Sequence, residues 1–317
     1  MIPPCSEEEA ALLAGVAERL REERYAVDVE DFPARPPEPL LAAYAFLSSV
    51  AGLLVYPAPL FAALLGIAAI VMHARDSEGR PLLRYDACTG ANVVARAPSA
   101  TRPALVILAR AGVAPQRFGE HTMRALGLAL QAGMVAIAAT GAAVWVAGAE
   151  SEVPRGVAAG ASVAAALVAV VAVLLYRPTR GDAAGGSPGA EVLLGLAPLL
   201  REHDVWLLVA GAGGTAAFVD AHPETAGAAW LNLEPSRGSG TVAVSEEGTW
   251  RERRADRFLM GAAEEAGAEV RPYRAAPTAA TPLLARRRRA LTLMVDDSAA
   301  AVLLARKTSE AVLSGGR

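Results

Sequence analysis

The clearest α/β signature lies in residues 190–233, which read AEVLLGLAPLLREHDVWLLVAGAGGTAAFVDAHPETAGAAWLNL. This stretch predicts a helix over 190–202, followed by a strand over 205–210. The strand is a continuous apolar run, as expected when both faces of a strand are buried. A short helix over 215–222 and another strand over 228–233 follow. Strands that alternate with helices predict a mixed, mainly parallel sheet covered by helices on both faces, which is an α/β fold.

The same alternation continues outward on both sides of this stretch. Before it, a helix is predicted over 6–24, where Ser6 and Glu9 form a capping box; strands are predicted over 25–30, 92–96 and 104–109. After it, we expect a short edge strand over 241–245, a helix over 254–265, strands over 270–273 and 291–295, and a last helix over 299–313. Gly267 stands where the helix over 254–265 should end, because glycine favours the left-handed conformation found there.

Four apolar segments interrupt the α/β pattern, at residues 40–56, 60–72, 125–148 and 156–176. The last two hold no Asp, Glu, Lys or Arg, and about 20 apolar residues suffice for a helix to cross a bilayer. A chain of 317 residues that is 53% hydrophobic and 20% charged fits a mixture of a water-soluble domain and membrane helices. The sequence therefore predicts two inserted transmembrane helical hairpins.

These features divide the chain into five segments. We expect the first helix and strand of the soluble domain in 1–38, hairpin 1 in 39–74, the first α/β part in 75–124, hairpin 2 in 125–176 and the second α/β part in 177–317. Arginines gather on one side of both hairpins: Arg75, Arg80, Arg84, Arg117, Arg124, Arg177 and Arg180. The positive-inside rule then predicts a multi-pass protein of the cytoplasmic membrane whose soluble domain is cytoplasmic.

Charge and cysteine content narrow the partners. The net charge is only −3, so nucleic acid is not an expected partner, whereas the lipid bilayer is. The N-terminus is acidic and lacks the pattern of a cleavable signal peptide. Cys5 and Cys88 have no metal-binding spacing, and two cysteines by themselves neither require nor exclude a disulfide.

The order of elements resembles the zinc-dependent aminopeptidase family, which is built on a mixed sheet between helices. The phrases that carry the resemblance are 92–95, 105–109, 193–200, 205–210 and 230–234. The resemblance implies two zinc ions held by histidines and carboxylates, with a glutamate as general base. Such zinc ions activate a water molecule and polarise the scissile carbonyl.

Most ligand positions that the resemblance implies hold other residues here. The matching stretches are Ala109-Arg110-Ala111-Gly112, Gly185-Gly186-Ser187-Pro188-Gly189, Gly211-Ala212-Gly213-Gly214 and Asp296-Asp297-Ser298. Only Glu234, in Asn232-Leu233-Glu234, keeps a carboxylate at an expected position. A lone carboxylate does not hold a catalytic zinc pair, so we expect no catalytic residue and no cofactor in a retained fold.

Two other groups of residues are candidate sites. Asp182, His222, Glu234 and Asp297 are the residues from which a rearranged zinc site could be built. Arg286, Arg287, Arg288 and Arg289 form a positive run that predicts either a solvated turn or contact with anionic lipid headgroups. Gly211–Gly214 follows a strand and opens a helix, but its spacing does not complete a dinucleotide-binding loop.

Three functions follow from these observations. The first is a membrane-integral, catalytically inactive relative of zinc aminopeptidases that binds a peptide or a membrane-protein partner, or acts as a scaffold. The second is an active membrane-bound metallopeptidase with the rearranged site. The third is a subunit of a membrane complex. Stoichiometric zinc in the purified protein would favour the second.

Overall fold

The computed structural model describes most of the chain. The described residues are 5–34, 37–55, 57–77, 88–98, 100–111, 120–147, 187–211, 213–236, 240–247, 252–273, 278–296 and 298–315, together with 156–157, 159–164, 166–167 and 170.

Helices and strands alternate along the chain as follows: α1 (Glu7–Glu22), β1 (Ala26–Ala34), α2 (Pro37–Leu54), α3 (Pro59–Ser77), β2 (Cys88–Arg96), β3 (Leu105–Arg110), α4 (Glu120–Ala147), α6 (Pro188–Leu200), β4 (Val205–Ala210), α7 (Gly214–Ala221), the 3₁₀ helix η1 (Pro223–Gly227), β5 (Ala229–Pro235), β6 (Val242–Glu247), β7 (Arg253–Arg254), α8 (Arg257–Ala266), β8 (Glu269–Tyr273), α9 (Thr281–Ala285), β9 (Arg289–Val295) and α10 (Ala299–Gly315). The chain divides into two compact units. The α/β unit comprises Met1–Arg35, Tyr85–Pro115 and Pro178–Arg317, and the helical unit comprises Pro36–Arg84 and Gln116–Arg177.

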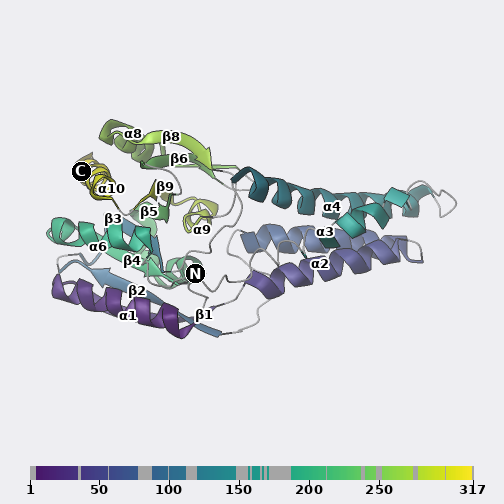
Figure 1. Cartoon of the computed structure of the whole chain (residues 1–317), viewed down its shortest axis with the longest axis horizontal. Helices are drawn as coiled ribbons and strands as arrows, with labels where there is room; N and C mark the ends of the chain where they lie inside the picture. The colour runs from purple at the N-terminus through teal and green to yellow at the C-terminus, as the bar shows by residue number, and fades with distance from the viewer. Residues whose placement is uncertain are drawn as a thin grey trace. The chain divides into compact units, whose positions relative to one another are not determined.

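A mixed sheet forms the centre of the α/β unit (Figure 1). The described strands lie in the order β1-β2-β4-β3-β5-β9-β6-β7, with β8 beside β6. The strands β4, β3, β5 and β9 run parallel, whereas β2 and β6 flank them in antiparallel pairing. The predicted mixed α/β fold is therefore confirmed, with parallel pairing among the four central strands and between β6 and β8.

Helices cover both faces of this sheet. Gly189 of α6 packs so closely on β5 that a Cβ there would lie 2.3 Å from the carbonyl oxygen of Leu233. Phe218 of α7 instead contacts the ring of Trp230. Side chains alternate between the faces of a strand, so Leu233 and Trp230 point in opposite directions. The helices α6 and α7 therefore lie on opposite faces, as the apolar run of β5 predicts.

A disulfide joins Cys5, just before α1, to Cys88, the first residue of β2. The two Cα atoms are 6.1 Å apart, and 83 residues separate the cysteines in sequence. Next to this link, the Ser6 hydroxyl accepts a hydrogen bond from the backbone N–H of Glu9, which confirms the predicted cap of α1. The Cys5–Cys88 disulfide therefore links the start of α1 covalently to the start of β2.

The helical unit is held together by close contacts between small residues. A Cβ added at Gly66 of α3 would lie 2.9 Å from the Cβ of Ala138 in α4. At Gly141 of α4 it would lie 2.7 Å from the backbone nitrogen of Ala63. Only glycine allows the backbones to approach this closely, so these two positions bring α3 and α4 into close contact.

The predicted multi-pass location in the cytoplasmic membrane is wrong, and so are the predicted transmembrane spans where the structure describes them; much of the segment 156–176 lies outside the described residues. Among the helices within the described ranges, none combines the length and the apolar character needed to cross a membrane. The charged residues Arg75 and Asp76 lie within α3, and Glu120 and Arg124 lie within α4. The uncharged parts are rich in alanine and glycine, which bury little apolar area.

Candidate functional site

The carboxyl ends of the four parallel strands meet at one edge of the sheet. In open α/β sheets, ligands bind outside this edge. The edge is where the resemblance predicts zinc ligands, and it presents Arg110 at the end of β3 and Glu234 near the end of β5. These two residues are brought together by the fold.

Glu234 is already bound by protein groups. Its Oε1 atom accepts a hydrogen bond from the backbone N–H of Ala279 at 2.7 Å and lies 3.4 Å from Nε of Arg110. The Glu234 side chain is 9% exposed, whereas that of Arg110 is 39% exposed. The carboxylate is therefore neutralised by a guanidinium that reaches toward solvent.

Behind Glu234 lies a buried polar network that the sequence analysis missed. Asn232 Nδ2 lies 3.4 Å from Glu234 Oε1 and donates to the hydroxyl of Thr292 at 3.1 Å. Thr292 in turn donates to Glu247 Oε2 at 3.0 Å. The hydroxyls of Thr278 and Thr281 also donate to Glu247, at 2.7 and 3.0 Å. Three threonines from two segments, the start of α9 and β9, thus surround one carboxyl group.

Burial raises the pKa of Glu247 above its ordinary value of 4.5. The hydrogen bonds from Thr278, Thr281 and Thr292 act against this rise, and the nearby negative charge of Glu234 adds to it. A buried carboxylate favours its neutral form unless hydrogen bonds or cations compensate. Glu247 therefore gives up its proton less readily than an exposed glutamate does.

A weak signal for this network was present in the sequence. Asn232 and Thr292 interrupt two otherwise apolar strands, and they occupy the same register position of the β5–β9 pair. A polar residue inside an apolar strand needs a buried partner. Nothing in the local sequence, however, indicates that Glu247 of the antiparallel edge would supply it.

His222 is held between two carboxylates at a different place. Its Nδ1 lies 2.8 Å from Glu224 Oε1, and its Nε2 lies 2.9 Å from Glu30 Oε2. The ring also stacks at 4.3 Å against Phe218. The two carboxylates contact opposite sides of the imidazole ring and do not converge on one point. Both contacts are hydrogen bonds only when both ring nitrogens carry a proton. The His222 hydrogen bond holds the pKa of Glu224 below its ordinary value although partial burial opposes this.

The two described members of the proposed rearranged zinc site, His222 and Glu234, lie apart. His222 lies before β5 and contacts Trp206 near the start of β4. Glu234 lies five residues beyond the start of β5, which corresponds to about 16 Å along an extended strand. Asp182 and Asp297 fall outside the described residues. Over the portion of the chain that the structure describes, no group of three or more His, Cys, Asp or Glu side chains could hold a metal ion.

The glycine-rich turn after β4 packs against the Asn92 side chain of β2. Gly213 has a φ of 82°, which a residue with a side chain rarely adopts. A Cβ at Gly214 would lie 1.9 Å from Oδ1 of Asn92, whose amide nitrogen donates to the Gly214 carbonyl. The turn is therefore a close approach of α7 to β2, which explains its glycines without a phosphate.

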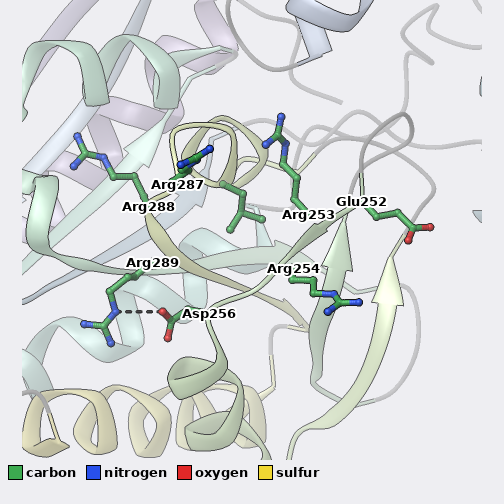
Figure 2. Close-up of a pocket in the computed structure, with 8 residues that line it drawn as sticks. Glu252, Arg253, Arg254, Asp256, Arg287, Arg288 and Arg289 are labelled. Carbon is green, nitrogen blue, oxygen red and sulfur yellow. Dashed lines mark hydrogen bonds and ion pairs between the residues drawn. The ribbon is translucent and has the colours of Figure 1, made fainter.

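The arginine run at the end of α9 divides into two parts. Arg286 forms a two-pronged ion pair with Asp220 of α7, with both nitrogen–oxygen distances at 3.1 Å, and its side chain is 9% exposed. The remaining three, Arg287, Arg288 and Arg289, line an open depression together with Leu284 of α9, residues 252–254 and Asp256, which caps α8 (Figure 2). Arg286 is thus not available to a lipid headgroup, and the predicted lipid contact of the other three stays a prediction.

Three solved structures provide a comparison. A leucine aminopeptidase precursor from Bacteroides thetaiotaomicron VPI-5482 has 10% identity and a TM-score of 0.44, covering 98% of this chain and 90% of that one. A zinc aminopeptidase from Bacillus subtilis has 9% identity and a TM-score of 0.46, with 98% and 88% covered. An aminopeptidase from Aneurinibacillus sp. strain AM-1 has 12% identity and a TM-score of 0.44, with 99% and 88% covered.

The chain is similar to zinc and leucine aminopeptidases. These structure neighbours belong to the family that the sequence resembles. No protein-family model and no curated protein matches the chain. At 9 to 12% identity the likeness concerns the fold, and no residue role is taken from it.

Proposed function

We propose that this chain is a non-catalytic binding or scaffolding protein built on an aminopeptidase-like fold. The observation that carries the proposal is the pairing of Glu234 with Arg110. Glu234 is the one carboxylate that the family resemblance leaves at a zinc-ligand position. Its Oε1 atom already accepts hydrogen bonds from the Ala279 N–H and from Asn232 Nδ2, and it forms an ion pair with the Arg110 guanidinium.

A guanidinium at this distance opposes metal binding. Zinc needs several histidine, cysteine or carboxylate ligands at about 2.0–2.3 Å, usually four in total. Arg110 cannot lose its proton in a protein, so its positive charge stays beside Glu234 at every physiological pH. A zinc ion at Glu234 would have to displace Arg110 and would still lack its other ligands.

The same pair suits the binding of a peptide or a protein partner. Arg110 is the exposed member, and a guanidinium presents several N–H donors to a carboxylate or a backbone carbonyl. Glu234 fixes its orientation from behind. A partner would therefore bind to the oriented guanidinium of Arg110 at the carboxyl ends of the parallel strands, and no catalytic step is needed for this binding.

Zinc content tests the proposal. The untagged full-length chain is equilibrated with zinc, dialysed, and analysed for metal, and hydrolysis of leucine p-nitroanilide is measured on the same sample. We expect substoichiometric zinc and no hydrolysis above the protein-free rate, both in the wild type and in Glu234→Gln. Stoichiometric zinc that Glu234→Gln removes, together with hydrolysis, would establish the rearranged metallopeptidase instead.

A further inference from the structure

The corner where α7 meets η1 is connected to the edge strand β1 by a single imidazole ring. His222 is the residue between α7 and η1, and β1 ends the strand order of the sheet. Nε2 of His222 lies 3.0 and 2.9 Å from the two carboxylate oxygens of Glu30 in β1. On the other side of the ring, Nδ1 lies 2.8 Å from Oε1 of Glu224 in η1. His222 therefore links two segments that are far apart in sequence.

Carboxylates predominate around this ring. Glu30 and Glu224 contact it directly, and Asp28 of β1 belongs to the same cluster through Arg96 of β2. The Arg96 guanidinium pairs with Asp28 and lies 3.3 Å from Glu30. Three carboxylates thus share one guanidinium in these printed contacts. A positive charge on His222 therefore offsets an excess of negative charge.

The faces of the imidazole pack against aromatic rings. The His222 ring lies edge-to-face with Trp206 of β4 at 5.7 Å and stacks on Phe218 of α7 at 4.3 Å. Neither of these rings titrates, so β4 and α7 contribute no charge through these contacts. The His222 side chain is still 13% exposed, and solvent can therefore deliver or remove its proton.

The positions of the two carboxylates require a proton on each nitrogen of the ring. A neutral imidazole has one N–H, so its other nitrogen would direct a lone pair at a carboxylate oxygen, and the two would repel each other. A proton on Glu224 instead is disfavoured: although desolvation opposes it, the hydrogen bond with His222 holds the pKa of Glu224 below its ordinary value. Glu30 is already the partner of Arg96. The imidazolium is therefore the form that fits this arrangement.

We propose that His222 is a pH-sensitive latch, which holds the α7–η1 corner against β1 while it is protonated and releases the corner when it loses that proton. Glu224 follows His222 by two residues and moves with the ring, whereas Glu30 belongs to another element. Breaking the contact to Glu30 therefore detaches the corner. The latch uses neither Glu234 nor Arg110, so its test is independent of the function proposed above.

Hydrogen exchange of the full-length chain tests the latch. The backbone N–H groups of His222 and Thr225 close the corner by donating to Phe218 and His222. We expect protection of residues 218–227, corrected for intrinsic rates, to fall at least about tenfold as the pH rises from about 5 to about 8, because one charge-assisted hydrogen bond is lost. The fall should follow the NMR signal of the His222 Cε1–H group. Peptides from α8 in the same digests report opening of the whole unit.

Two variants change the latch in opposite directions. His222→Gln has no proton to lose, so protection of the corner should be low and independent of pH. In Glu224→Gln, the new amide can donate to Nδ1 while a neutral ring donates from Nε2 to Glu30, so the corner should stay protected throughout. His203→Gln, which changes a histidine just before β4, is the control and should behave as the wild type. Circular dichroism shows that each variant is folded.

Three results would overturn the proposal. The first is a wild-type corner whose protection does not change with pH, and the second is an unaltered pH dependence in His222→Gln. The third is a Glu224→Gln corner that is released over the same pH range as in the wild type.

Discussion

Glu247 shows how a single buried residue can make the stability of a fold depend on pH. Its side chain is buried among three threonine hydroxyls, and burial raises its pKa above 4.5. A carboxyl group with a raised native pKa binds its proton more tightly in the folded chain than in the unfolded one. Its contribution to stability is therefore complete below pH 4.5 and is lost as the pH rises through the native value.

We expect Glu247→Gln to reduce the loss of stability that the wild type suffers as the pH rises above 4.5. Glutamine keeps the shape and can still hydrogen-bond the threonines, but it has no proton to lose. Urea unfolding at several pH values between 4.5 and 8 measures the slope. The control is Glu310→Gln on the exposed face of α10, which should leave the slope as it is. Equal slopes in the wild type and Glu247→Gln would contradict the prediction.

At the scale of the element, α8 illustrates how local chemistry defines a helix. Asp256 caps its first turn by accepting from the N–H groups of Phe258 and Leu259. Gly267 ends it with a φ of 101°, in the left-handed conformation. The sequence predicted this end from the glycine alone, because a residue with a Cβ is strained there.

Gly267→Ala should lower the free energy of unfolding by about 1 kcal/mol, because alanine at this φ is strained. Gly261 is the matched control within the same helix, where an added Cβ meets nothing within 4 Å. Gly261→Ala should therefore raise stability by about 0.5–1 kcal/mol. Both are read from urea unfolding of the purified chain, and changes of the same sign would refute the interpretation.

At the scale of the whole molecule, the Cys5–Cys88 disulfide closes a long loop. The 83-residue separation includes the first part of the helical unit, Pro36–Arg84, so the bond constrains much of the unfolded chain. Cross-linking a loop of this length restricts the unfolded ensemble and stabilises the folded state. The disulfide therefore matters more for stability than two isolated cysteines suggest.

Removing the disulfide with Cys5→Ala/Cys88→Ala should lower the free energy of unfolding by about 2–4 kcal/mol. Reduction of the wild type with dithiothreitol should produce a similar loss, whereas the double variant should not respond to the reductant. Urea unfolding with and without reductant measures both effects. A double variant as stable as the oxidised wild type would show that the bond contributes nothing.

Local patterns in the sequence determined the elements of the α/β unit. The apolar runs at Val205–Ala210 and Leu105–Arg110 are strands buried on both faces, Ser6 caps α1, and Gly267 ends α8. Each of these follows from residues within one or two turns of chain. The candidate Glu234 instead came from the resemblance to zinc aminopeptidases, as the carboxylate at an expected ligand position.

Only the tertiary structure decided what surrounds those elements. Hydropathy alone predicted membrane spans, whereas no helix within the described residues is both long and apolar enough to cross a membrane. The pairing of Glu234 with Arg110, the threonines around Glu247 and the separation of His222 from Glu234 depend on strand register and on segments far apart in sequence. A local pattern records which face of an element is apolar, but not which distant side chain will meet it.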